Sequence, residues 1–377
     1  MTLSDTLPRL ATTDPVEHTI SIIGRPIGPE QIGGTDWTTP LPTPTSWSLS
    51  FDETTRPYAS LTLTYPRPAF DWGRIDPTSD ETRMRLRITL GYRWPAAGDH
   101  AEEQTALVIM NTLDDDEETG TVTITASSDE SLLDEEVRPG RLYEVPDWAV
   151  DVATVWDQAC AACLPMWKVP IRAKNPVAPG YLEGLRNLQL ASGDKFDEFA
   201  WTLADTCGLW LHSDQSPQSQ GGLIAEARRG PASRPALDLT PTSRYPITKR
   251  RRTTKSLADY ASHLALTVHW KDGDDQKEIS KLFKIINAPA TKLVSRDLTL
   301  RPPRWDATTR YLPDGWPPAM ELLYRLQKRT WTQTIDARSC YWLRPRDTVL
   351  TTLGPALIGS VSFDGSTGLM TITARPY

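Results

Sequence analysis

Four cysteines and five histidines are the residues of this 377-residue chain whose types are best suited to metal or redox chemistry. Cys160 and Cys163 have the CxxC spacing of a metal or redox site. No second CxxC and no nearby histidine completes a zinc site, and no predicted strand leads into the pair as in redox loops. Both cysteines fall on one face of a predicted helix, so we interpret them as buried thiols, with metal binding as the alternative.

The histidines do not form a catalytic or metal-binding motif. They are scattered along the chain, at His18, His100, His212, His263 and His269. His269 adjoins Trp270 in a predicted strand, which favours a structural or surface role. The chain contains no GxSxG elbow, no GxxxxGK[ST] loop and no GxGxxG after a strand. We therefore predict a protein without catalytic residues, metal or cofactor.

Acidic residues gather in two predicted turns, LDDDEE at 113–118 and DGDD at 272–275. Neither has the spaced ligands and terminal glutamate of a calcium-binding loop. Each is interpreted as a solvated hairpin tip, with cation binding as the alternative. In the first turn the candidate contacts to a partner are Asp114, Asp115, Asp116, Glu117 and Glu118.

One dense basic run is present, and its members are Lys249, Arg250, Arg251 and Arg252. No aromatic residues are interleaved with it, and the formal net charge of the chain is −7, so the pattern does not favour sequence-specific nucleic-acid binding. The first 150 residues contain no lysine and are strongly acidic, whereas the remainder is basic. This asymmetry indicates two surfaces with different neighbours or head-to-tail packing of copies; two solvated faces are the alternative.

The 14 tryptophans are numerous enough to suggest a sugar-binding surface, because exposed aromatic rings stack on sugars. However, Trp47, Trp148, Trp156 and Trp270 occupy predicted core positions. No apolar run approaches the roughly 20 residues that span a bilayer, and the N-terminus resembles no secretory signal. We expect folding in a cytoplasm without stable membrane insertion.

The stretch 107–133 predicts an antiparallel hairpin. The apolar run Leu107–Met110 enters the acidic turn, and Thr121–Ala126 returns with period-2 alternation before SSDESLL turns the chain away. The same alternation predicts strands over 46–51, 60–65 and 83–90. Strict alternation is typical of an antiparallel sheet or barrel with one buried and one wet face.

A change of period follows. We predict helices from an Asp147 cap to Cys163 and from a Ser192 or Asp194 cap to Cys207, then a hairpin of 209–212 with 222–227. The chain is β again from residue 264. The expected strands there are 264–270, 282–286, 293–300, 329–337, 347–352, 356–363 and 369–375, with one helix within 317–328.

The predicted fold class is α+β and mainly β, with two antiparallel β-barrel-like domains and a small α+β insert. The predicted parts are an extended N-terminal arm at 1–45, a first barrel at 46–135, the insert at 136–245 and a second barrel with one helix at 246–377. Within the arm, the run 18–23 is able to add as an edge strand to a neighbour. The arm itself is either a tether in an assembly or a plain terminus.

Three stretches carry a resemblance to a known family. They are TGTVTITASSDESLL at 119–133, FDEFAWTLADTCGLWLHSD at 196–214 and GSVSFDGSTGLMTITARP at 359–376; IDPTSDETRMRLRITL at 75–90 is also similar. In these the chain resembles the tail hub, or minor tail, proteins of long-tailed phages of actinobacteria. That family is related in fold to the baseplate hub of contractile phages and to the base of type VI secretion spikes.

The resemblance implies a homotrimer at the virion tail tip. Two barrel-like domains per chain would form a pseudo-sixfold ring around a central channel, through which DNA passes only in transit. The expected partners are a distal tail protein, the tail tube, the tape-measure protein and tail fibre or receptor-binding proteins. No appended fibre, lysozyme or peptidase domain is evident, so cell-wall degradation is not expected. The alternative is a glycan-binding receptor-recognition module of the tail tip.

Overall fold

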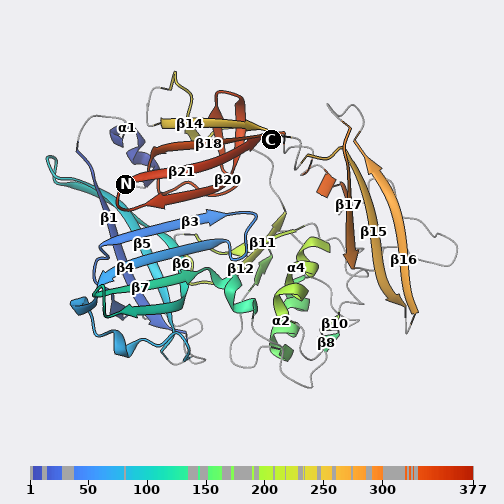
Figure 1. The fold of residues 1–377 in the computed structure, drawn as a ribbon, viewed down its shortest axis with the longest axis horizontal. Helices are drawn as coiled ribbons and strands as arrows, with labels where there is room; N and C mark the ends of the chain where they lie inside the picture. Colours follow the sequence, from blue (N-terminus) through green and yellow to red (C-terminus); the bar gives the residue numbers. More distant parts are fainter. Residues whose placement is uncertain are drawn as a thin grey trace.

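The protein is described from a computed structural model. The structure describes residues 3–10, 15–27, 38–79, 82–134, 143–144, 152–163, 171–173, 189–190, 195–206, 209–216, 218–227, 232, 234–243, 248–256, 260–272, 275–285, 291–299, 319–320, 322–323, 326 and 330–376. Figure 1 shows three parts: a large sheet at one end, two helices with a short hairpin in the middle, and a separate three-stranded sheet at the other end.

The large sheet has 13 strands in the order β14-β18-β21-β20-β3-β4-β7-β6-β5-β1-β2, with β19 pairing β20 and β13 pairing β19. Its strands are β1 Glu17–Pro26, β2 Thr39–Pro40, β3 Ser46–Asp52, β4 Ala59–Pro66, β5 Met84–Trp94, β6 Asp99–Asp116, β7 Thr121–Ser127, β13 Leu237–Asp238, β14 Thr248–Lys255, β18 Trp331–Arg338, β19 Thr348–Thr351, β20 Gly354–Asp364 and β21 Leu369–Pro376. Short helices η1 Leu3–Thr6, α1 Leu7–Leu10, η3 Arg67–Ala69, η4 Trp72–Arg74 and η5 Asp129–Asp134 lie between or before them.

Alternation along the strands explains the sheet. In β3 the side chains of Trp47, Leu49 and Phe51 are buried, while Ser46 and Ser48 are exposed. β4, β5 and β7 repeat this pattern, which confirms the strands predicted from it. The fold is mainly β with a large antiparallel sheet, as predicted. Because β3 pairs with β20, strands of both predicted barrel domains belong to one sheet, and the domain boundaries remain predictions.

The long strand β6 connects two parts of this sheet. Residues up to Ile109 pair with β5, whereas Ile109 to Asp116 pair with β7, so the two neighbours occupy different lengths of one strand. The predicted hairpin is confirmed, but β6 begins at Asp99, well before the apolar run that marked it. β1 contains the run predicted as an edge strand, and it pairs with β5 of the same chain.

An aromatic cluster joins the β1–β5 layer to the C-terminal strands. Tyr92 and Tyr341 stack with ring centroids 5.1 Å apart, and the Tyr92 hydroxyl donates to the carbonyl of Ser339 at 2.8 Å. His18 Nδ1 lies 2.8 Å from the Tyr341 hydroxyl. Residues more than 300 positions apart in sequence are therefore held in one apolar core.

This cluster predicts a pH dependence of stability. Burial, assisted by the positive charge of Arg338, lowers the pKa of His18 to about 4 from its ordinary value of 6.5. Unfolding therefore takes up a proton between pH 6.5 and pH 4, and stability falls as the pH falls through this window, by about 3 kcal/mol from this residue. The His18→Asn variant keeps a hydrogen-bond acceptor but cannot titrate. Urea unfolding at pH 7 and pH 4.5 should show a smaller loss for the variant; equal losses would contradict the assignment.

The insert contains α2 Val152–Cys163 and α4 Phe196–Thr206, with β8 Tyr143–Glu144, β9 Ile171–Ala173, β10 Gln189–Leu190, β11 Leu209–Ser213 and β12 Leu223–Ala227. β11 and β12 form the predicted antiparallel hairpin, and β9 adds to β12 in parallel. Trp156 of α2 packs edge-on against Phe196 of α4, which confirms Trp156 as a core residue. The predicted caps and Cys207 lie outside the described residues.

The strands β15 His263–Asp272, β16 Asp275–Lys284 and β17 Leu293–Thr299 form a separate sheet in the order β16-β15-β17. β16 starts directly after the Asp-Gly turn, so the predicted return strand 282–286 was too short, and β17 runs parallel to β15. Leu264, Leu266 and Phe283 pack with Ala319 and Leu323 of the predicted third helix. The three strands predicted at 264–270, 282–286 and 293–300 therefore belong to this small sheet and not to the large one.

Candidate functional site

The acidic turn predicted as a partner contact lies at the tip of the β6–β7 hairpin. All five of its carboxylate residues are exposed. Arg67 forms ion pairs with Asp115 (2.9 Å) and with Glu117. Asp116 accepts the backbone N–H of Glu118 at 2.8 Å and is hydrogen-bonded by Thr119, which lowers its pKa.

Asp114 and Glu118 therefore differ from the other three carboxylates of the tip. Asp115 and Glu117 share the single positive charge of Arg67, and Asp116 shapes the turn. Asp114 and Glu118 project from the same tip and form no ion pair with the residues that the structure describes. Asp114 and Glu118 are therefore the two carboxylates of the tip that neither pair with Arg67 nor shape the turn.

The basic run lies on β14, the strand at one edge of the large sheet. Arg250 and Arg252 are exposed and form no ion pair within the described part of the chain. Arg251 points the other way: it is half-buried and donates to the carbonyl of Leu239. Lys249 lies in β14, and its side chain is outside the described residues.

The structure does not bring the acidic and basic groups together within one chain. β14 and β6 are separated by six intervening strands in the sheet order. Along β14 only one side is paired, with β18, and residues 111–116 of β6 pair only with β7. Among the strands described, each group therefore lies along an unpaired stretch of strand, and the two stretches carry opposite charge.

A buried polar clamp, which sequence reasoning treated only as a turn, follows the hairpin. It consists of Ser128, Asp129 and Glu130, all with less than 5% of their surface exposed. The Ser128 hydroxyl accepts the backbone N–H of Ala59 at 2.8 Å, and Glu130 accepts that of Ser213 at 2.6 Å. Burial raises the pKa of Glu130. The clamp therefore connects β4 to the β11–β12 hairpin of the insert.

Asp129 is the centre of this clamp. Its carboxylate forms an ion pair of 2.8 Å with Arg85 of β5 and accepts the backbone N–H of Gly222. The neighbouring Gly221 has φ of +108°, and a side chain at that position would collide with the Arg85 guanidinium. The positive φ and the close approach both require glycine there. Asp129 thus holds the sheet and the loop between β11 and β12 together.

Three arginines of the β1–β5 layer converge on Gln220 in the same loop. Arg25 and Arg85 each donate to its carbonyl oxygen at 2.9 Å, and Arg87 donates to its side-chain oxygen at 3.3 Å. Burial, with repulsion from the other two arginines, lowers the pKa of Arg25 to about 10. The alternating arginines of β5 predict a solvent-exposed face. In the structure Arg85 and Arg87 instead bind the loop between β11 and β12 of the insert.

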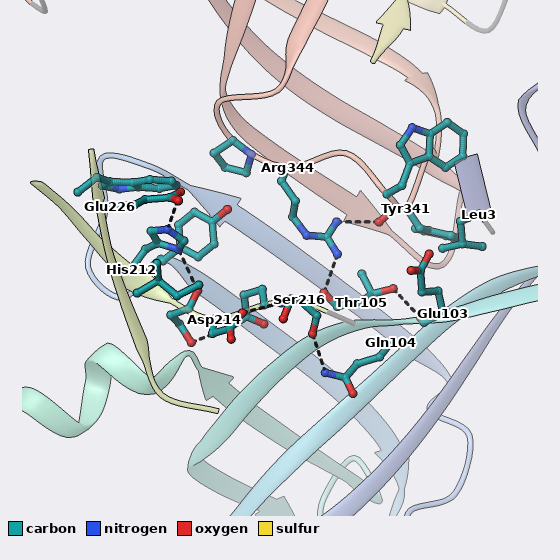
Figure 2. Close-up of a pocket in the computed structure, with 17 residues that line it drawn as sticks. Leu3, Glu103, Gln104, Thr105, His212, Asp214, Ser216, Glu226, Tyr341 and Arg344 are labelled. Carbon is teal, nitrogen blue, oxygen red and sulfur yellow. Dashed lines mark hydrogen bonds and ion pairs between the residues drawn. The ribbon is translucent and has the colours of Figure 1, made fainter. Parts of the chain in front are cut away.

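A cavity of about 290 Å³ lies beside the clamp, between β6, the β11–β12 hairpin and the segment after β18 (Figure 2). Arg344 reaches across it and donates to the carbonyls of Tyr341 and Thr105, both at 2.7 Å. His212 lies 3.4 Å from Glu226 and 3.0 Å from the carbonyl of Ser213. Arg344 thus binds backbone carbonyls on two sides of the cavity, and His212 lies between Glu226 and a backbone carbonyl, so these groups connect the three parts that meet there.

Metal chemistry has little support in the described residues. Within them, no three His, Cys, Asp or Glu side chains come together in a way that holds a metal ion. His269 lies on the small sheet, 3.7 Å from Glu278 and 3.8 Å from Asp297, at the surface as predicted. Cys160 and Cys163 share α2, but their side chains are outside the described residues. No helix among the described residues is long and apolar enough to cross a membrane.

The tryptophans whose side chains the structure describes give no support to a sugar-binding surface. Those whose side chains are described are buried or half-buried: Trp47, Trp72, Trp94, Trp156, Trp201, Trp210, Trp331 and Trp342. The exposed large apolar side chains of the described part are Leu282, Leu293 and Leu353. Trp148 and the side chain of Trp270 lie outside the described residues.

No family model and no curated protein matches the chain. Among solved structures it is similar to the tail protein from Neisseria meningitidis MC58, with a TM-score of 0.57 and 11% identity, covering 95% of this chain and 96% of that chain. It is also similar to the 43 kDa tail protein of prophage MuSo2 from Shewanella oneidensis, with a TM-score of 0.56 and 11% identity, covering 95% and 98%. A chain of the Francisella PdpA-VgrG complex matches with a TM-score of 0.53 and 11% identity, covering 99% of this chain and 60% of that one.

At these identities the similarity establishes the fold alone. The chain has the fold of phage tail proteins along almost its whole length. The resemblance inferred from sequence is confirmed to that extent, and its restriction to phages of actinobacteria remains a prediction.

Proposed function

We propose that the chain is a structural subunit of a phage tail, a hub that assembles as a homotrimeric ring at the tail tip. The observation that carries this proposal is the similarity along 95% of the chain to two tail proteins of nearly the same extent. The described cavity and clamp support it, because their polar groups hold together the parts of the chain that meet there.

The edges of the large sheet supply surfaces for ring closure. A ring requires a heterologous contact, in which one surface of a copy binds a different surface of the next. The free side of β14 and residues 111–116 of β6 are two such surfaces, because unpaired strands present backbone N–H and C=O groups ready to pair. We propose that these two edges meet between copies.

Opposite charge favours this pairing over association of like edges. Arg250 and Arg252 project from β14, and Asp114 and Glu118 project from the hairpin tip, all exposed. Two basic edges or two acidic edges would repel each other, whereas a basic edge attracts an acidic one. In this arrangement the basic run of one copy contacts the acidic hairpin tip of the next copy, head to tail around the ring.

The ring would join the tail tube or distal tail protein to the adhesion apparatus, and its channel would let DNA pass in transit. At the tail tip the chain would also contact the tape-measure protein and the tail fibre or receptor-binding proteins. The virion would be made in the host cytoplasm. The glycan-binding alternative has less support, since the described tryptophans do not project from the surface.

The native mass of the purified chain tests the proposal. A trimer gives three times the chain mass of 42.1 kDa by light scattering. The measurement needs no partner and no activity.

A further inference from the structure

One carboxylate at the cavity of about 290 Å³ has no partner among the described residues. Glu103 of β6 is half-buried and lines the cavity, yet its carboxylate forms no ion pair and no hydrogen bond within the described part of the chain. Its backbone carbonyl accepts the Thr105 hydroxyl at 3.1 Å. Figure 2 shows the carboxylate rising from β6 on the side of Leu3 and Tyr341. The side chain is therefore available to a molecule that enters the cavity.

The strand register directs Glu103 toward the inner side of the sheet. Glu103 pairs with Leu90 of β5, and the side chain of Leu90 is completely buried. Because directly paired residues of an antiparallel sheet project to the same face, Glu103 lies on the core-facing side of β5 and β6. Glu102 pairs with Gly91 and is exposed on the opposite face. A carboxylate on the inner side of a sheet is costly to leave unpaired, so a positively charged group at this position would be stabilising.

The other charged groups of the cavity are bound within the chain. Arg344 donates to three backbone carbonyls, each at 2.7 Å. Glu226 lies 3.4 Å from His212, and Asp214 accepts the backbone N–H of Ser216 at 3.1 Å. Together with the unpaired carboxylate, three carboxylates and one guanidinium line the cavity. The lining is therefore net negative even when His212 is protonated, which favours a cation over an anion as the occupant.

Aromatic rings form much of the remaining wall. Tyr58 and Trp210 meet edge-on with ring centroids 5.6 Å apart, and Trp210 stacks on His212 at 3.8 Å. Trp342 is half-buried and forms no ring–ring or cation–ring contact with the described residues. The face of an aromatic ring attracts cations, and tryptophan attracts them most strongly. Among basic side chains, arginine has a planar guanidinium that stacks on rings and binds a carboxylate through two N–H groups.

We propose that the cavity binds an arginine side chain of a partner protein, with Glu103 accepting two N–H donors of the guanidinium and Trp342 packing against its face. The volume of about 290 Å³ is just below the roughly 300–1,000 Å³ of pockets that enclose whole small molecules, so it suits one long side chain. Hydrogen bonds to the chain fix the surrounding walls, and binding therefore requires little ordering of the protein.

The partner is a different protein and not a second copy of this chain; this choice rests on the proposed ring. In the ring, copies meet through β14 and residues 111–116 of β6. Residue 103 precedes that stretch by eight positions, a distance of about 26 Å along an extended strand. The cavity is therefore separate from the contact proposed between copies.

Saturation-transfer NMR with three amino-acid probes tests the inference. N-acetyl-arginine amide carries the guanidinium, N-acetyl-citrulline amide is a neutral analogue of the same shape, and N-acetyl-glutamate amide is an anion. The arginine probe should bind the wild-type protein, and the other two should not. Glu103→Gln should weaken this binding about tenfold or more, because a hydrogen bond to a charged group is lost. Glu102→Gln, the neighbouring change on the opposite face, should leave it unchanged.

The contrary results each overturn a stated part of the inference. No binding, or equal binding of the arginine and citrulline probes, would show that the cavity has no site for a cation. Binding of the glutamate probe instead would assign the cavity to an anionic partner of Arg344. A lower native mass of Glu103→Gln with an unchanged circular dichroism spectrum would assign the occupant to a second copy. A monomeric wild-type protein that binds the arginine probe would overturn the ring and support the site.

Discussion

Replacing Asp129 with alanine should destabilise the protein by about 3–5 kcal/mol, the cost of breaking a buried ion pair by removing one partner. Asp129 has no exposed surface in its side chain, and Arg85 has 14% exposed. Without the carboxylate, Arg85 keeps a buried positive charge and the N–H of Gly222 loses its acceptor. Urea unfolding followed by tryptophan fluorescence measures the change.

The Asp71–Arg74 ion pair provides a matched control. It has the same 2.8 Å separation, but its side chains are 64% and 79% exposed. Asp71→Ala should therefore cost within about 1 kcal/mol. Equal effects of Asp129→Ala and Asp71→Ala would show that the clamp does not hold the insert to the sheet.

The double variant Arg250→Glu, Arg252→Glu should convert the trimer to a monomer while leaving the fold intact. Both side chains are exposed and lie on the free edge of β14, so reversal places acidic residues against the acidic hairpin tip of the next copy. Arg251 is left unchanged because it donates to Leu239 within the chain. Native mass and circular dichroism separate loss of assembly from loss of folding.

Two further variants make this test specific. Adding Asp114→Lys and Glu118→Lys to the double variant restores opposite charge with the sign exchanged, and trimers should return. Reversal of Lys284 and Arg296, two exposed cations of the small sheet, should leave the trimer unchanged. A trimer that survives reversal of Arg250 and Arg252 would refute the proposed edge contact.

The strands of the large sheet were predictable because their burial alternates residue by residue. Trp47, Leu49 and Phe51 face the core and the serines between them do not, so period 2 alone locates β3. The β11–β12 hairpin was located differently, from two β-prone runs on either side of a Ser/Gln/Gly loop, because β11 is buried along its whole length. The C-terminal hairpin was located from two β-prone runs closed by the DGSTG turn. The local sequence is therefore sufficient to locate these elements.

The clamp was not predictable by the same reasoning. Asp129 is buried only because Arg85 and the loop at Gly222 converge on it from 44 and 93 residues away in sequence. Alternating arginines in β5 have the pattern of a solvent-facing side, and nothing local indicates that Gln220 covers them. The one available clue was the glycine pair Gly221–Gly222, whose positive φ values fit a close approach of backbone.

The sequence also did not indicate which sheet each predicted strand belongs to. The strands β15 and β16 alternate in burial like those of the large sheet, but alternation does not say which strand is the neighbour. Their separation follows from a second small core around Leu266 and Leu323. The serines and threonines that alternate with core residues in β3 and β4, in contrast, were correctly predicted to face solvent.

The native mass of the wild-type protein tests the central claim most directly. Light scattering over a range of micromolar concentrations should give three times 42.1 kDa, and raising the salt concentration should weaken the trimer because screening reduces the attraction between the charged edges. A stable monomer at these concentrations in low salt would contradict a ring-forming hub.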